Sequence, residues 1–238
     1  MSDIEYLKKY YEGNIEDAIK RLEDGEPVQY IVGNVDFYGN IFKVDKRALI
    51  PRFETEGLCE IALSYLKQGM DIVDLGTGSG CIAVTLKKKI PNLNIDAVDI
   101  SSKALSLARE NAFLNDVDIN FILGDMLEPL NKKYDCIISN PPYIPYDEEV
   151  MDIVKNNEPN NALYADLDGL YFYDIILKNC KKYLKKNFYI FFEIGYNQGK
   201  RIEELAHKYL DCNTTIKKDL QGFDRYVIIS SKILNNNV

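Results

Sequence analysis

From residue 70 onward, short apolar runs alternate with longer amphipathic runs along the chain. The apolar runs predict strands, and the amphipathic runs, with apolar residues at helical spacing, predict helices. Strands that alternate with helices in this way are typical of a parallel, doubly wound sheet. The predicted strands are residues 71–75, 95–99, 118–123, 134–139, 188–194, 214–219 and 225–230. The predicted helices are residues 81–89, 102–115, 169–184 and 200–210.

The last two predicted strands, 214–219 and 225–230, have no helix between them. Gln221-Gly222 provides a turn at this point. The arrangement predicts a closing hairpin, with one antiparallel strand at or near the edge of the sheet. We therefore expect an α/β fold with a mostly parallel, seven-stranded sheet.

A different pattern precedes this region. Residues 4–24 carry apolar side chains on helical faces and predict one or two short helices. Residues 28–50 alternate apolar and polar positions in patches around a turn at Gly39-Asn40, which predicts a β-hairpin. A helix is expected over about residues 54–68. The expected organisation is a short helical segment (1–26), a β-hairpin linker (27–52) and a large α/β domain (53–238).

Composition narrows the function. The chain has 238 residues, of which 46% are hydrophobic and 28% charged, enough for a packed core. The net charge of −8 argues against a protein whose main task is to hold nucleic acid. No apolar run is long enough for a membrane span, and no signal peptide is evident. The 5 cysteines are far apart without a CxxC pair, and His207 is the single histidine, so we expect no metal and a cytoplasmic protein.

The segment 74–80, Asp-Leu-Gly-Thr-Gly-Ser-Gly, lies between a predicted strand and a predicted helix. Glycine permits a tight turn and lets the backbone approach a ligand where a side chain would collide. Asp99 ends the next predicted strand, where its carboxylate could accept hydrogen bonds from both hydroxyls of a ribose. These features alone do not separate a nicotinamide dinucleotide from S-adenosylmethionine. The Gly-x-Gly-x-Gly spacing and the preceding Asp74 favour S-adenosylmethionine.

Asn140-Pro141-Pro142-Tyr143 directly follows the strand predicted at 134–139. The Asn140 amide oxygen and the Pro141 carbonyl can both accept hydrogen bonds from one planar NH₂ group, because prolines bring no N–H to compete. The Tyr143 ring offers a face for stacking. Such a site can hold a weakly nucleophilic nitrogen in line with a methyl donor, so positioning would provide most of the catalysis. We expect catalysis by Asn140, Pro141 and Tyr143, with Pro142 also contacting the substrate.

Further segments give the chain a resemblance to a known family. They are Pro27-Val28-Gln29-Tyr30-Ile31-Val32-Gly33, Phe37-Tyr38-Gly39, Leu49-Ile50-Pro51-Arg52-Phe53-Glu54-Thr55-Glu56, Asp168-Gly169-Leu170, and Glu193-Ile194-Gly195 with Gln198. Together with the two motifs above, they make residues 27–230 similar to the HemK/PrmC protein-(glutamine-N5) methyltransferases. These enzymes methylate the glutamine of the Gly-Gly-Gln motif in peptide chain release factors. The helical segment ahead of the hairpin is shorter here than the family's bundle.

The resemblance implies a Rossmann-like class I S-adenosylmethionine-dependent methyltransferase with release factors as partners. It assigns the cofactor to Asp99, Met126, Asn140 and the glycine loop. The loop residues concerned are Gly76, Thr77, Gly78, Ser79 and Gly80. An apolar side chain at Met126 would cover the adenine. Asp125 either accepts a hydrogen bond from the adenine amine or caps a helix.

The resemblance leaves two interpretations for three other residues. Phe37 and Arg52 either close the pocket from the hairpin side or have structural roles. The structural roles would be core packing for Phe37 and an ion pair of Arg52 with Glu54 or Glu56. Glu193 either holds the loop on the cofactor side or serves the fold alone.

Two other functions are compatible with parts of this pattern. An RNA or DNA base N-methyltransferase could use the same Asn-Pro-Pro-Tyr geometry. The acidic net charge argues against it, because phosphate neutralisation provides most nucleic-acid affinity. A module that only binds S-adenosylmethionine would not need the two amide acceptors of Asn140 and Pro141. Glutamine methylation of release factors, without direct nucleic-acid or membrane contact, is therefore the favoured interpretation.

Overall fold

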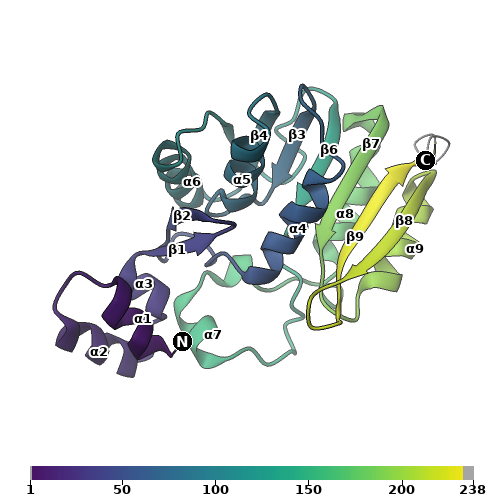
Figure 1. The fold of residues 1–238 in the computed structure, drawn as a ribbon. Helices are drawn as coiled ribbons and strands as arrows, with labels where there is room; N and C mark the ends of the chain where they lie inside the picture. The colour runs from purple at the N-terminus through teal and green to yellow at the C-terminus, as the bar shows by residue number, and fades with distance from the viewer. Residues whose placement is uncertain (1, 233–238) are drawn as a thin grey trace.

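The computed structural model describes residues 2–232 and contains a seven-stranded sheet with the order β5-β4-β3-β6-β7-β9-β8 (Figure 1). Strands β3 to β7 are parallel to one another, whereas β9 is antiparallel to both β7 and β8. The predicted mixed sheet, with an antiparallel strand near one edge, is confirmed. The strands are β3 (Asp71–Leu75), β4 (Asn94–Asp99), β5 (Asn120–Leu123), β6 (Tyr134–Ser139), β7 (Leu184–Glu193), β8 (Cys212–Lys218) and β9 (Asp224–Ser231).

Helices cover both faces of this sheet (Figure 1). Helices α8 and α9 pack on one face, around a core that includes Tyr173, Leu177 and Ile202. Helices α4, α5 and α6 pack on the other face, around Leu58 and Leu86. The bounds are α4 (Phe53–Leu63), α5 (Cys81–Lys89), α6 (Ser102–Leu114), α8 (Tyr171–Asn179) with the 3-10 turn η2 (Cys180–Tyr183), and α9 (Gly199–Tyr209).

The N-terminal helices lie apart from the sheet, beyond the hairpin of β1 (Asn34–Phe37) and β2 (Asn40–Lys43) (Figure 1). They are α1 (Asp3–Tyr10), α2 (Ile15–Glu23) and α3 (Val28–Val32), and they share a small core. The prediction of a hairpin from residue 28 was wrong at its start, because α3 occupies 28–32. This helix begins after Pro27 and ends at Gly33 with φ +82°, and one turn is too short to show helical periodicity.

The segment that follows the Asn140-Pro141-Pro142-Tyr143 motif contains two short helices that the sequence pattern did not predict. They are α7 (Asp152–Asn157) and the 3-10 turn η1 (Asn160–Ala162). The Asn157 side chain donates to the Gly25 carbonyl at 2.8 Å, which links this segment to the N-terminal helices. Over residues 2–232, no helix is long and apolar enough to cross a membrane. The five cysteines are buried and free.

Candidate active site

The glycine loop, Asp99 and Asn140 meet at one edge of the sheet because β3, β4 and β6 are adjacent and parallel. Each of the three segments lies at or just beyond the carboxyl end of its strand. The Ser139 hydroxyl ties two of these ends together by donating to the Leu75 carbonyl at 2.6 Å. This edge is the usual ligand site of an open α/β sheet.

Backbone hydrogen bonds shape the glycine loop. The amides of Gly76 and Thr77 both donate to the Val98 carbonyl, at 2.9 and 3.0 Å. Gly76 and Gly78 have φ of +70° and +55°, in the left-handed region that favours glycine. A Cβ at either position would find no atom closer than 3.9 Å, so the space above the loop is open for a ligand. Gly80 differs, because its Cβ would lie 3.1 Å from that of Ala108, which gives it a packing role.

Asp99 lies at the end of β4 and is anchored by two backbone amides. Its Oδ2 accepts from Gly78 N–H at 2.9 Å and its Oδ1 from Ser101 N–H at 2.8 Å. Burial raises the pKa of this carboxyl, and the two amides oppose that effect. Each carboxylate oxygen can accept more than one hydrogen bond, so ribose hydroxyls could still bind.

The surroundings of the loop fit S-adenosylmethionine. Met126 has φ +41°, and its terminal methyl lies 4.0 Å from the position of a Cβ on Gly76, so its side chain lies beside the loop, where an adenine ring could pack against it. Asp74 lies beneath the loop, fully buried, and accepts from the Thr77 hydroxyl at 2.6 Å. Burial raises the pKa of Asp74 to about 7. Thr77 and Ser79 are themselves buried, so they stabilise the loop.

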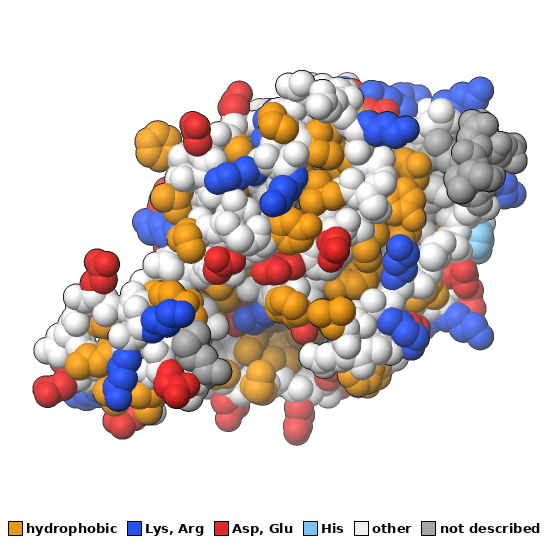
Figure 2. Space-filling model, in the orientation of Figure 1, with side chains coloured by type: hydrophobic (Ala, Val, Ile, Leu, Met, Phe, Trp, Pro, Cys, Tyr) orange, Lys and Arg blue, Asp and Glu red, His pale blue; other side chains and the backbone are white. Residues whose placement is uncertain are grey.

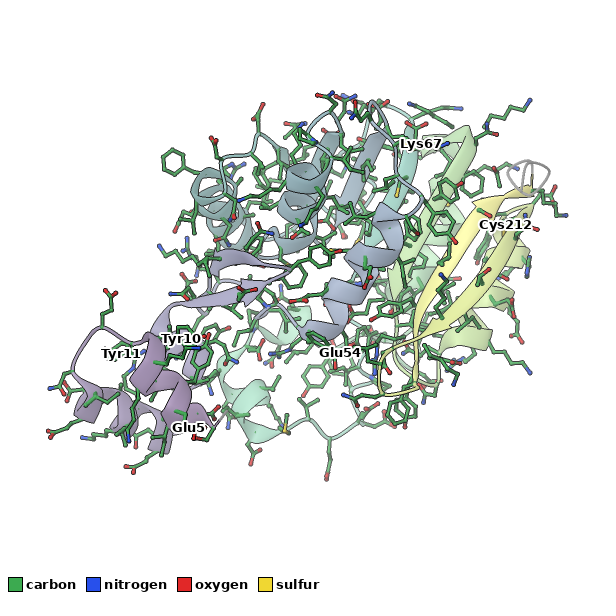
Figure 3. The ribbon with its side chains drawn as sticks, in the orientation of Figure 1. Glu5, Tyr10, Tyr11, Glu54, Lys67 and Cys212 are labelled. Carbon is green, nitrogen blue, oxygen red and sulfur yellow. The ribbon has the colours of Figure 1, made fainter. Side chains whose placement is uncertain are left out.

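The Asn140 side chain is oriented by a residue outside its own motif. Its Nδ2 donates to Oγ1 of Thr55 at 3.1 Å. Thr55 belongs to the first turn of α4, directly after Glu54, which Figure 3 labels at the start of that helix. The Asn140 Oδ1 accepts no hydrogen bond from the described residues and is therefore available to a substrate.

Tyr143 is held at both ends. Its hydroxyl donates to Oε1 of Glu193 at 3.4 Å, and its carbonyl accepts from Nε2 of Gln198 at 2.8 Å. Gln198 also binds the Asp168 carbonyl and the Gly195 amide. The Tyr143 ring packs against the core cluster of α8 and α9, and a stacking role toward substrate stays a prediction.

Glu193, at the end of β7, is 1% exposed. Burial raises the pKa of its carboxyl to about 7, although the nearby Thr55 side chain and the positive charge of Arg225 act in the opposite direction. The Glu193 carboxyl contacts the Asn-Pro-Pro-Tyr loop, because it accepts a hydrogen bond from the Tyr143 hydroxyl. This position supports a role in holding that loop.

The structure corrects two alternatives. Arg52 does not pair with Glu54 or Glu56; its guanidinium contacts the buried Glu158 at 2.5 Å. Glu158 follows α7, 106 positions further along the chain, and also accepts from the Ile50 amide. No helix begins at Asp125, which lies in an exposed turn, so the capping role is wrong.

Phe37 is 1% exposed and packs edge-on against Phe42 at 5.8 Å between ring centroids. It belongs to the core cluster beneath α4 and α5, which supports the interpretation as core packing. Among the described residues, this cluster contains no member of the glycine loop or of the Asn140–Tyr143 loop, so it does not support a place for Phe37 in the cofactor pocket.

Thr55 and Gln198 had no role predicted for them, although both lie in the segments that carry the family resemblance. Their neutral side chains give no chemical signal by themselves. Only the three-dimensional arrangement reveals the roles of Thr55 and Gln198. Each donates to or accepts from Asn140 or Tyr143 across at least 55 positions of the chain.

Comparisons with known proteins agree with this geometry. The model of the family described as Methyltransferase small domain matches residues 57–157. The release factor glutamine methyltransferase of Flavobacterium psychrophilum is 43% identical over 226 residues, covering 90% of this chain and 79% of that protein. The corresponding enzyme of Staphylococcus aureus is 44% identical, covering 88% of this chain and 78% of that protein.

Among solved structures, a release factor-specific protein-(glutamine-N5) methyltransferase from Alicyclobacillus acidocaldarius is 29% identical with a TM-score of 0.51. The alignment covers 80% of this chain and 99% of that chain. A methyltransferase from Pyrococcus furiosus is 15% identical with a TM-score of 0.63, a likeness of fold alone. The fold is that of class I S-adenosylmethionine-dependent methyltransferases, and the chain belongs to the release factor glutamine methyltransferase family.

Proposed function

We propose that the protein transfers a methyl group from S-adenosylmethionine to the side-chain amide nitrogen of the glutamine in the Gly-Gly-Gln motif of peptide chain release factors. The observation that carries this proposal is the free Oδ1 of Asn140 beside the Pro141 carbonyl, at the strand ends that also present the glycine loop. The identity to release factor glutamine methyltransferases over most of the chain supports it.

Gly76, Gly78, Asp99 and Met126 would hold the cofactor, which supplies a methyl group on a positively charged sulfur. Asn140 and Pro141 would each accept one hydrogen of the glutamine NH₂ group. An amide nitrogen is a weak nucleophile, because its lone pair is delocalised into the carbonyl. Its fixed direction therefore provides most of the rate increase. A separate base is not needed beforehand, since the N–H becomes acidic as the new N–C bond forms.

Methylation of RNA or DNA bases is the less favoured function. On the face seen in Figure 2, lysine and arginine side chains are interspersed with acidic ones. The loop after the Asn-Pro-Pro-Tyr motif also exposes Asp147, Glu148 and Glu149, which would repel phosphates. Location in the cytoplasm and the absence of direct nucleic-acid contact stay predictions.

The test is methyl transfer from radiolabelled S-adenosylmethionine to purified release factor and, separately, to total RNA. We expect label in the release factor, and none when its glutamine is replaced by alanine. Label in RNA with none in the release factor would support the base methyltransferase instead.

A further inference from the structure

The Asn140 side chain can lie in two orientations related by a half-turn, because its oxygen and its NH₂ group have almost the same shape. Only one orientation presents an acceptor to a substrate NH₂ group. In the other, two NH₂ groups would face each other without a hydrogen bond. In the structure Nδ2 binds Thr55 Oγ1 at 3.1 Å and Oδ1 is free. Thr55 is therefore placed to determine which of the two Asn140 orientations is populated.

A hydroxyl alone would not make this choice, because it can donate as well as accept. The Thr55 hydrogen must point elsewhere if its oxygen is to accept from Asn140. Glu193 can provide the acceptor, because its Oε2 is buried without a hydrogen-bond partner among residues 2–232 and the Thr55 side chain helps to lower the pKa of this carboxyl. Thr55 is 3% exposed and Glu193 1% exposed, so water does not compete easily for either group. In its ionised form the Glu193 carboxylate can only accept, so a hydroxyl beside it must donate to it.

Long-range contacts fix the position of Thr55. The Tyr226 hydroxyl on β9 donates to the carbonyl of Glu54, the preceding residue, at 2.7 Å. Gly57 allows this close approach, because a Cβ there would lie 2.2 Å from the Tyr226 oxygen. The start of α4 is thus pinned to the sheet beside Asn140.

We propose that Thr55 is a positioning residue that fixes the amide orientation of Asn140, with Glu193 directing the Thr55 hydroxyl. The inference rests on the proposed function for its kinetic consequence. Without the hydroxyl, both amide orientations become populated and the competent fraction falls. A lost hydrogen bond of this kind lowers turnover by about tenfold. Thr55 is not among the residues that would hold the cofactor, so the affinity for S-adenosylmethionine should not change.

The kinetic test compares three variants with wild-type protein. Thr55→Val keeps the shape and removes the hydroxyl, whereas Thr55→Ser keeps the hydroxyl. Thr85→Val is the matched control, because Thr85 is equally buried on α5 and its hydroxyl has no partner among residues 2–232. We expect kcat on release factor to fall about tenfold in Thr55→Val, and to stay within about threefold in the other two. The Kd for S-adenosylmethionine should stay within about twofold in all three.

Wild-type kcat in Thr55→Val, or an equal loss in Thr55→Ser, would overturn the inference. A measurement without substrate separates it from the proposed function. The side-chain NH₂ signals of Asn140 in a ¹⁵N–¹H spectrum, assigned by their loss in Asn140→Asp, should move toward the free-amide position in Thr55→Val and not in Thr85→Val. Unmoved signals would also overturn it. Wild-type protein that leaves release factor unmethylated would refute the proposed function, while the NH₂ signals still decide the role of Thr55.

Discussion

The two halves of the candidate site are built in different ways. The glycine loop is shaped by backbone hydrogen bonds to β4, the next strand of the chain, through Val98 and Asp99. The Asn140–Tyr143 loop is instead held by side chains from distant elements, namely Thr55, Glu193 and Gln198. The cofactor side therefore follows from local sequence, whereas the substrate side depends on the complete fold. Damage far from the motif should thus affect substrate positioning more than cofactor binding.

Gly169→Ala should have the largest effect, because it forces a side chain against the Asn140–Tyr143 loop. Gly169 has φ +79°, and a Cβ there would lie 2.0 Å from the Tyr143 carbonyl oxygen and 2.4 Å from Nε2 of Gln198. Left-handed strain costs about 1–2 kcal/mol and forced overpacking about 1–3 kcal/mol. We expect the free energy of unfolding, measured in urea, to fall by about 2–5 kcal/mol.

Gly222→Ala is the control for Gly169→Ala, because Gly222 has φ +88° and nothing within 4 Å of the added Cβ. It should lose only the strain contribution, about 1–2 kcal/mol. Equal losses in the two variants would mean that the Asn140–Tyr143 loop is not closely held by its neighbours.

Asn140→Ala should lower kcat by about 10²–10³, the usual cost of removing one oriented polar contact to the reacting group. Asn140→Asp tests positioning against base catalysis, because it keeps an acceptor oxygen and adds a charge. Positioning predicts that Asp retains more activity than Ala but less than Asn, since the carboxylate must be desolvated. An Asn140→Asp rate that climbs between about pH 4 and 6 to the wild-type value would contradict positioning.

Asp99→Ala should act on the cofactor side alone. Hydrogen bonds to a charged acceptor contribute about 1.5–3 kcal/mol each, so calorimetry should show S-adenosylmethionine binding weakened at least about tenfold. The KM for release factor should change little. Asp118→Ala, an exposed carboxylate just before β5, is the matched control and should bind normally. Unchanged affinity in Asp99→Ala would show that the ribose lies elsewhere.

The smallest effect should come from Glu110, which touches neither loop. Arg47 and Lys43 lower the pKa of this surface carboxyl to about 2, below its ordinary value near 4.5. A lowered folded pKa contributes stability above about pH 4.5 that is lost as the pH falls toward 2. For an exposed group, Glu110→Gln should cost about 0.2–1 kcal/mol at pH 7 and nothing near pH 2. A change in kcat or cofactor affinity would contradict its remoteness from the site.

The contrast between the two loops also explains how much could be predicted from sequence. Helix 81–89 was predicted with its observed bounds because Gly80 and Pro91 mark its limits. Strand β7 begins at Leu184, earlier than predicted, because Lys185 and Lys186 interrupt the apolar pattern there. Local pattern thus fixes the element and leaves its ends less certain.

Contacts between distant parts of the chain could not be predicted. The Arg52–Glu158 pair joins the start of α4 to the end of α7, and α7 itself has only six residues and no buried face. Thr55 became visible as a partner of Asn140 only once α4 was placed on β7 and β9. Spacing along the sequence carries no information on such pairs.

Methylation of the release factor glutamine can be measured by mass spectrometry. Purified release factor would be incubated with S-adenosylmethionine and either wild-type protein or Asn140→Ala, digested, and fragmented to locate any added methyl group. We predict one methyl on the glutamine side chain of the Gly-Gly-Gln peptide with wild-type protein, and little or none with Asn140→Ala. An unmodified peptide, or a methyl group on a different residue, would contradict the account.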